Sequence, residues 1–341
     1  MRHTTDIFLA ATGTWLPDER RSLADAVAAG LVGESHRDLG YESIAVEESG
    51  TAPVDMAVAA ARQAVGRSGV AGADFGLHLH ASVWFQGLDC WAPAAYVANQ
   101  AVGPQAIAYS VDQRSAGGLG AVHLAAAYLS CGTVANALVT TADRFDGPAI
   151  DRWNSYVQAI WGDGGTALVL STEGGFARLL SSVVVSDNSL ERWDRGATPF
   201  ASGPLQETPV QVEKRFEQHA ATPDAVAEFA QWTAAVLAAR DQALAEAGVE
   251  LGDLKRAVLP FVHRGGGQAE LHDLLGLTEE QTVWREFGRH VGHLGAGDPF
   301  AGLDRLLQDG ALAVGDRVLL YSVGVGFTMA AAVIEITDLP A

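Results

Sequence analysis

Apolar residues recur along this chain with two different periods, and the alternation of these periods predicts its fold class. Stretches in which every second residue is apolar predict strands, and apolar residues at i, i+3 and i+4 predict helices. In the first half the predicted strands span residues 7–14, 75–81, 106–111, 135–141, 165–171 and 177–185, and the predicted helices span 53–69, 93–102 and 115–130. Strands that alternate with helices in this way indicate an α/β protein.

The same order of elements starts again further along the chain. A predicted helix at 224–247 is followed by an acidic turn and a strand, just as the helix at 53–69 is. The later predicted elements are a strand at 257–262, helices at 270–275 and 301–308, and strands at 317–322 and 327–336. The repetition predicts two similar halves, residues 1–175 and 176–341.

Residues 187–219 follow neither period. The segment is polar, contains prolines and carries Trp193 and Phe200. A long irregular segment in a compact protein is usually a functional loop, although a plain surface loop fits the same pattern. We interpret residues 187–219 as a cap over a pocket.

The charge balance argues against two classes of partner. The 341 residues include 41 Asp or Glu and 22 Lys or Arg, which gives a net charge of −19. Such a surface is a poor partner for nucleic acid or an anionic membrane. The sequence shows no apolar run of the ~18 residues that cross a membrane and no signal-peptide pattern, and its only cysteines are Cys90 and Cys131. We therefore expect a soluble protein of the reducing cytoplasm, without membrane association.

Ser115 stands where a predicted strand turns into an Ala-rich helix. Unpaired backbone N–H groups and the helix dipole favour developing negative charge at such a position, which suits a nucleophile. Gly117 and Gly118, just behind the serine, would let a second segment approach closely and help to shape an oxyanion site. The alternative interpretation is that Ser115 only caps the helix.

A serine hydroxyl needs a general base to act as a nucleophile, and a third group usually orients that base. Two downstream histidines are candidates. His263 follows the predicted strand 257–262 and precedes three glycines, and His293 lies in a glycine-rich stretch with Asp298 close by. Each histidine, taken alone, is also consistent with a purely structural residue whose polar atoms are hydrogen-bonded.

Two other sets of residues carry weaker signals. His78 and His80 alternate on one strand, but no third ligand lies at a useful spacing, so we predict no metal site. Cys90 is a rival nucleophile, but no predicted helix starts at it, and we interpret it as an inert buried thiol.

Several short motifs, in the right order and spacing, resemble those of the ketoacyl-ACP synthase III family. They are GTWLP at 13–17, Ser115-Ala116-Gly117 in place of the family's Cys-x-Gly, GDGGTA at 162–167, His263 at the family's motif histidine, and GVGFT at 324–328. The resemblance spans almost the entire chain. It implies a thiolase fold, five-layered αβαβα with two duplicated halves, and a homodimer.

The resemblance also implies roles for individual residues. Backbone N–H groups of Gly324, Gly326 and Phe327 would help to form the oxyanion hole, together with Gly117. His293 aligns with the family's asparagine, and with Asp298 it resembles a divergent branch of starter-unit synthases and acyltransferases in antibiotic biosynthesis. His293 would be the base for Ser115, Asp298 would orient it, and His263 would polarise the thioester carbonyl or steady the enolate.

Three functions are compatible with this resemblance. The first is starter-unit selection, in which Ser115 takes a short acyl group such as propionyl from acyl-CoA and passes it to a malonyl-carrier acceptor in polyketide priming. The second is acyl transfer to a sugar or aglycone hydroxyl, and the third is a non-catalytic synthase partner. We expect no bound cofactor, because acyl-CoA, or the phosphopantetheine arm of an acyl carrier protein, would be the substrate.

Overall fold

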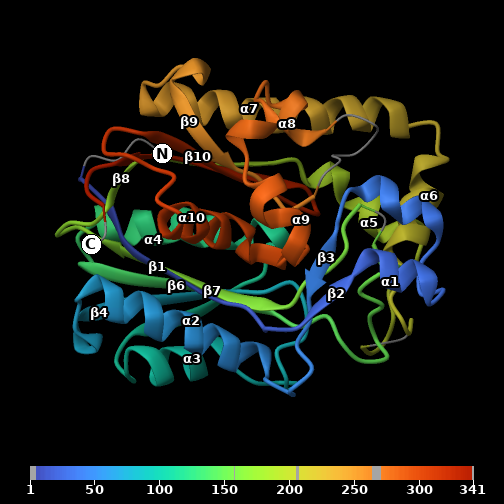
Figure 1. Ribbon diagram of the computed structural model, residues 1–341, viewed down its shortest axis with the longest axis horizontal. Coiled ribbons are helices and arrows are strands. Elements are labelled where there is room, and N and C mark those ends of the chain that lie inside the picture. The colour runs from blue at the N-terminus through green and yellow to red at the C-terminus, as the bar shows by residue number, and fades with distance from the viewer. Residues whose placement is uncertain (1–4, 157, 205–206, 263–269, 340–341) are drawn as a thin grey trace.

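Helices and strands are stacked in alternating layers (Figure 1). The computed structural model describes residues 5–156, 158–204, 207–262 and 270–339. One outer layer holds α2 (Pro53–Ser68) and α3 (Pro93–Ala101), the middle layer holds α4 (Gly117–Ser130) and α10 (Asp298–Gln308), and the other outer layer holds α7 (Ala225–Ala247) and α8 (Leu271–Leu274). Strands lie between these helical layers, which confirms the expected αβαβα arrangement.

The strands of the first half form one side of a nine-stranded sheet. They are β1 (Phe8–Trp15), β4 (Phe75–Ala81), β5 (Ile107–Val111), β6 (Asn136–Asp143) and β7 (Gly164–Ser171). From the middle of the sheet outward their order is β1-β7-β6-β4-β5. The pairs β1–β7 and β7–β6 are antiparallel, whereas β6–β4 and β4–β5 are parallel.

The second half repeats the order and directions of four of these five strands, β1-β7-β6-β4, and extends from β1 toward the other edge of the sheet. Its strands are β8 (Ala177–Ser186), β9 (Leu254–Val258), β10 (Arg317–Gly324) and β11 (Thr328–Ile336), in the order β8-β11-β10-β9. The first two pairs are again antiparallel and the next is parallel. The halves join where Phe8 and Leu9 pair with Arg178 and Ala177. Two duplicated halves are therefore present in the fold.

Glycines allow α2 to approach the sheet closely. A Cβ atom on Gly13 would lie 2.2 Å from the Ala60 carbonyl oxygen, and one on Gly165 would lie 2.6 Å from the Met56 carbonyl oxygen. Any side chain at either strand position would push the helix away. The helix itself starts with Pro53 and ends before Gly69, whose φ of 69° suits glycine.

The middle-layer helices tie the halves together. α4 contacts β4 and β6 of the first half and β8, β10 and β11 of the second, and α10 likewise contacts strands of both halves. Both helices are largely buried, with apolar residues around most of α4, as expected for a helix enclosed between two layers of strands. This rigid centre carries the turn at Ser115 on one helix and Asp298 on the other.

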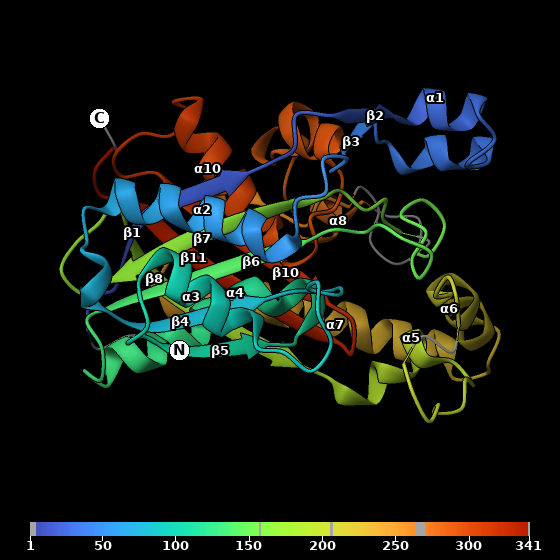
Figure 2. The same ribbon diagram turned by 90° about the horizontal axis from the view of Figure 1, so that it is seen from below.

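The remaining elements gather mostly at one end of the layers (Figures 1 and 2). They are β2 (Arg20–Ser22), α1 (Leu23–Ala28), β3 (Ser43–Ala45), α5 (Arg192–Arg195), α6 (Val212–Ala220) and α9 (Arg289–Val291). Short 3₁₀ segments, such as those at Glu34–Leu39 and Asn188–Glu191, connect some of them.

Three sequence-based expectations require correction. Residues 187–219 are not wholly irregular, because they contain α5 and most of α6. The strand expected at 257–262 is β9, Leu254–Val258, and it stops before Pro260, which has no N–H to continue the ladder. The helix expected from residue 115 begins at Gly117, after a 3₁₀ turn at Arg114–Ala116.

Candidate active site

Ser115 lies in the tight turn between β5 and α4. The preceding residue, Arg114, has a left-handed backbone with φ 48°, which is uncommon for a residue with a side chain. The end of β10 lies directly against this turn, because a Cβ on Gly324 would be 2.5 Å from the Gln113 carbonyl oxygen and 2.8 Å from the Ala116 nitrogen. The turn is thus held from both sides.

The hydroxyl of Ser115 contacts an imidazole from the second half of the chain. Ser115 Oγ lies 2.9 Å from Nε2 of His293. On the other side of the same ring, His293 Nδ1 lies 2.5 Å from Oδ2 of Asp298. Serine, histidine and aspartate therefore form a continuous hydrogen-bonded chain.

The contacts of Asp298 fix the proton on His293. Its Oδ2 also accepts the Phe261 N–H at 2.6 Å, and its Oδ1 accepts the Leu294 N–H at 2.7 Å. A carboxylate that already accepts two backbone N–H groups also accepts Nδ1–H from the ring. Nε2 then presents its lone pair to Ser115, as proton abstraction requires. The negative charge of Asp298 adds to burial in raising the pKa of Tyr41.

Small residues bring the His293 loop against α4. A Cβ on Gly118 would lie 2.4 Å from the Ala296 carbonyl oxygen, and one on Gly295 would lie 2.5 Å from Oδ2 of Asp143. Gly117 is equally confined, since its Cβ would lie 2.9 Å from the Ala81 Cβ. Glycine behind the serine is thus required for packing, and Gly117 is buried beneath Ser115.

Trp161 fixes the plane of the imidazole. Its ring stacks on His293 with the centroids 4.8 Å apart and the planes 27° apart. Backbone hydrogen bonds from His293 N to Ile160 O, at 2.9 Å, and from Gly162 N to His293 O, at 3.0 Å, hold the two segments side by side. The GDGG segment at 162–165 therefore packs beside the site.

Ser115 and His293 open into a cavity of about 920 Å³. Gly326 and Phe327 line it too, while Gly324 lies at the base of the Ser115 turn. Residues of the 187–219 segment form much of the wall, including Trp193, Phe200 and Phe216. The segment thus lines a pocket, as the interpretation as a cap requires. His263 lies outside the described residues.

Sequence reasoning missed several cavity residues. Tyr156 and Trp161 line the cavity but were assigned no role, and Trp193 and Asp194 were covered only by the interpretation of residues 187–219 as a cap. The signal available was the concentration of aromatic residues in polar segments without clear periodicity.

His78, His80 and Cys90, which the sequence analysis also considered, have no place in the hydrogen-bonded chain of Ser115, His293 and Asp298. The Thr140 hydroxyl lies 2.8 Å from both His78 Nε2 and His80 Nδ1, and burial lowers the pKa values of these histidines to about 3 and about 4. Both rings are therefore neutral and buried in the core. Cys90 is exposed, so the expectation of a buried thiol is wrong.

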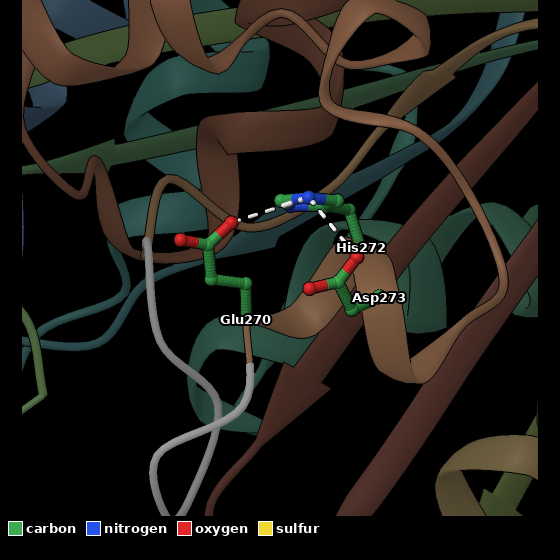
Figure 3. Close-up of side chains that lie close together, drawn as sticks. All are labelled: Glu270, His272 and Asp273. Atoms are coloured by element: carbon green, nitrogen blue, oxygen red, sulfur yellow. Dashed lines mark ion pairs between the residues drawn. The ribbon is translucent and has the colours of Figure 1, made fainter.

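Within the described parts of the chain, Glu270, His272 and Asp273 form one group with atoms of the metal-ligating kind (Figure 3). His272 Nε2 lies 3.2 Å from Oε2 of Glu270 and 3.5 Å from Oδ1 of Asp273. These are ordinary contacts between neighbouring polar side chains at a partly exposed site, and we assign no metal to it. None of the described helices is both long and apolar enough to cross a membrane.

Comparison with known proteins identifies the family. The profile of 3-oxoacyl-[acyl-carrier-protein] synthase III matches residues 109–188, and its C-terminal profile matches residues 244–336. The structure of ChlB3, an acyltransferase, is 36% identical and superposes with a TM-score of 0.89 over 98% of this chain and 99% of that one. The chain belongs to the ketoacyl-ACP synthase III family. It is therefore an acyl-transferring enzyme of the thiolase superfamily.

More distantly related proteins are also similar along nearly the whole chain. The synthase III of Sphingopyxis alaskensis is 28% identical over 98% of this chain and all of its own. The synthase III structure from Aquifex aeolicus is 18% identical, with a TM-score of 0.76 over 96% of this chain and 99% of its own, and confirms the thiolase fold. The priming β-ketosynthase of the R1128 polyketide pathway has the same fold, with 20% identity and a TM-score of 0.75 over all of this chain and 99% of its own.

Proposed function

We propose that this family member transfers acyl groups through an ester on Ser115. The 2.9 Å contact between Ser115 Oγ and His293 Nε2 carries the proposal. The serine oxygen attacks the carbonyl carbon of an acyl thioester, while its proton moves to Nε2 of His293. Collapse of the tetrahedral intermediate breaks the C–S bond, and the leaving thiolate takes the proton from His293.

Asp298 has the role of orienting and stabilising the imidazolium in this scheme. Backbone N–H groups of Gly326 and Phe327, which line the cavity beside Ser115, are the candidates for the oxyanion site. Acyl-CoA is the simplest donor, with short chains such as propionyl, and an acyl carrier protein is the alternative. His263 has the role of polarising the thioester carbonyl or steadying an enolate, as the family resemblance implies.

For the second half-reaction we propose a hydroxyl acceptor. A hydroxyl oxygen attacks the Ser115 ester, its proton passes to His293 Nε2, and collapse returns that proton to Ser115 Oγ. A cavity of about 920 Å³ with many aromatic side chains favours a bulky acceptor over a slender pantetheine arm alone. The similarity to ChlB3, an acyltransferase, along the whole chain adds support for acyl transfer.

Polyketide priming is the second candidate. The similarity of fold to a priming β-ketosynthase favours it. In this reaction the acyl group on Ser115 would pass to the carbanion of a malonyl-carrier thioester, with loss of carbon dioxide. Such a step needs groups that stabilise an enolate as well as a base for Ser115.

An acyl-chase experiment separates the two candidates. The enzyme is acylated with propionyl-CoA, freed of donor, and mixed with a malonyl-carrier protein or with a panel of hydroxyl compounds. The proposal predicts a propionyl ester and no carbon dioxide. Release of carbon dioxide together with a β-ketoacyl carrier would overturn the choice of acceptor in favour of priming.

We also propose a homodimer, formed through the edge of the sheet at β5. This strand is the last of its half and exposes Ile107 and Tyr109, at 43% and 48% of their surfaces. The neighbouring helix α4 exposes Leu124 at 45%. An exposed edge strand with apolar side chains is a template for pairing with a second chain.

A further inference from the structure

The hydroxyl of Tyr41 is bound to the same residue that donates to Asp298. Tyr41 lies just before β3, is buried, and has its Oη 2.5 Å from the carbonyl oxygen of Phe261. The N–H of Phe261 donates to Oδ2 of Asp298 at 2.6 Å, and that oxygen lies 2.5 Å from Nδ1 of His293. A series of buried contacts therefore runs from Tyr41 to the imidazole that faces Ser115.

Phe261 depends on these two contacts because it lies beyond the end of β9. It follows Pro260, and its N–H and C=O are not part of the sheet. Asp298 binds the N–H and Tyr41 binds the C=O, both in buried surroundings. A buried backbone group that loses its partner is costly, so the backbone of Phe261 would shift if either contact were removed. The place of the donor to Asp298 therefore depends on Tyr41.

The phenol of Tyr41 is a dependable donor because it keeps its proton. Burial raises its pKa well above the ordinary value for tyrosine, and the charge of Asp298 adds to this rise. The carbonyl of Phe261 can only accept, so the proton of the hydroxyl points to it. The ring is also fixed, since it meets Trp284 edge-on with the centroids 5.0 Å apart and the planes 74° apart.

The residues that follow Tyr41 are bound to the chain that leads into His293. Ser43 Oγ donates to the carbonyl oxygen of His290 at 2.8 Å. Through such contacts β3 packs beside α9 (Figure 1). The position of Tyr41 relative to the His293 loop is thus held by the fold and does not depend on the phenol alone.

We propose that Tyr41 positions the base His293 for the acylation of Ser115. It acts through Phe261 and Asp298, because the Phe261 N–H holds Oδ2 where it also accepts the Nδ1–H of the imidazole. The proposal rests on the proposed function, since it concerns the same base. Tyr41 is not part of the cavity wall, so it is a positioning residue and does not touch the substrate.

Tyr41→Phe tests the role of the hydroxyl because it keeps the ring. The single-turnover rate of Ser115 acylation by propionyl-CoA should fall about 10-fold, since a misplacement of about 1 Å can cost about 100-fold. With the donation from Phe261 weakened, the carboxylate of Asp298 attracts the imidazolium more strongly. The acid limb of the pH profile of acylation should therefore move to higher pH, by about half a pH unit. A purely structural role would leave this profile unchanged.

The same change in the background of Asp298→Asn shows whether Tyr41 acts through Asp298. In that background the hydroxyl has no carboxylate to orient, so the double variant should acylate within about twofold of Asp298→Asn alone. A further loss of about 10-fold, as large as the loss that Tyr41→Phe causes in the wild type, would show an independent effect and overturn the proposal.

Tyr321→Phe is the matched control. Tyr321 is likewise buried, its hydroxyl donates to the Val236 carbonyl at 2.9 Å, and it is not part of the cavity wall. Both variants should lower the midpoint of urea unfolding, but Tyr321→Phe should keep the acylation rate and its pH profile. A Tyr41→Phe enzyme that matches the wild type in rate and profile, or an equal loss of rate in Tyr321→Phe, would overturn the proposal. Absence of any acyl-enzyme in the wild type would instead overturn the proposed function.

Discussion

Ser115 and His293 are 178 residues apart in sequence, and their side chains meet at 2.9 Å across the boundary between the two halves. Neither half contains both residues, so the pair exists only because α4 and the loop before α10 pack together. One tight contact in this packing is that of Gly118 with the Ala296 carbonyl oxygen, which leaves no room for a Cβ atom. Packing of the core and chemistry at the site are therefore linked through a few glycines.

Replacing Gly118 tests that link. A methyl group there would lie 2.4 Å from the Ala296 carbonyl oxygen and force the His293 loop away from Ser115. Gly118→Ala is expected to destabilise the protein by about 1–3 kcal/mol and to slow thiol release from acyl-CoA by about 100-fold. Urea unfolding and a thiol-reactive dye measure the two effects.

Gly120→Ala is the control for this change. Gly120 belongs to the same helix, but a Cβ there would meet nothing within 4 Å. The alanine should stabilise the helix by about 0.5–1 kcal/mol and leave the rate unchanged. Equal loss of activity in both variants would show that the contact with Ala296 does not position the site.

Asp298→Asn removes the negative charge of Asp298 but keeps the size of its side chain, so we expect His293 to lose its function as a base while the packing of the site is retained. Asparagine can donate to His293 Nδ1 and so stabilise the wrong tautomer, for which a loss of about 10⁴-fold in rate is typical. The single-turnover rate of Ser115 acylation is the measurement. Asp304→Asn, on the same helix and buried, removes the negative charge that pairs with Arg67 at 2.8 Å outside the cavity. This control should lose stability and keep its acylation rate, and a loss of rate as large as that of Asp298→Asn would contradict the account.

The raised pKa of Asp194 predicts a pH-dependent gain in stability for Asp194→Asn. Because the folded protein favours the neutral acid, with a pKa of about 7, the wild type loses stability as the pH rises from the unfolded pKa to 7. The variant has no such group, so its advantage should grow by about 2 kcal/mol between pH 5 and pH 8. Urea unfolding at both pH values measures it, with Glu191→Gln as control. A constant difference would mean that the Asp194 carboxyl titrates normally.

The edge of β5 gives a prediction for assembly. Tyr109→Lys combined with Leu124→Lys would place two charges in the proposed interface and should convert a dimer to a monomer, as light scattering after gel filtration can show. Val226→Lys is a control, because Val226 is 83% exposed on α7, outside this patch. A dimer that survives the double change would place the interface elsewhere.

Much of the fold was predictable because local signals agreed with the global structure. The periods of β4 and α2 predicted their bounds to within a residue, and the repeated order predicted the duplication. Ser115 was predictable because a strand, a turn and an Ala-rich helix met there. The spacing of His293 and Asp298 and the family resemblance predicted their roles, which stay predictions, while the structure joins both residues to Ser115 in one chain of contacts.

Other features depend on contacts that a sequence does not display. The end of β9 follows from Pro260, but apolar residues on both sides of the proline concealed the boundary. The cap helices α5 and α6 are short and polar, so they depend on packing, such as that of Trp193 on Phe216 and His219, more than on propensity. The raised pKa of Asp194 likewise depends on its burial, which the sequence does not display.

The most direct test of the central claim is the mass of the protein after incubation with propionyl-CoA. The account predicts one added propionyl group, mapped by peptide analysis to Ser115, and its absence in Ser115→Ala. Removal of the base in His293→Ala should slow its formation by several orders of magnitude. An unmodified wild-type chain, or a propionyl group on another residue that persists in Ser115→Ala, would contradict the claim and revive a non-catalytic role.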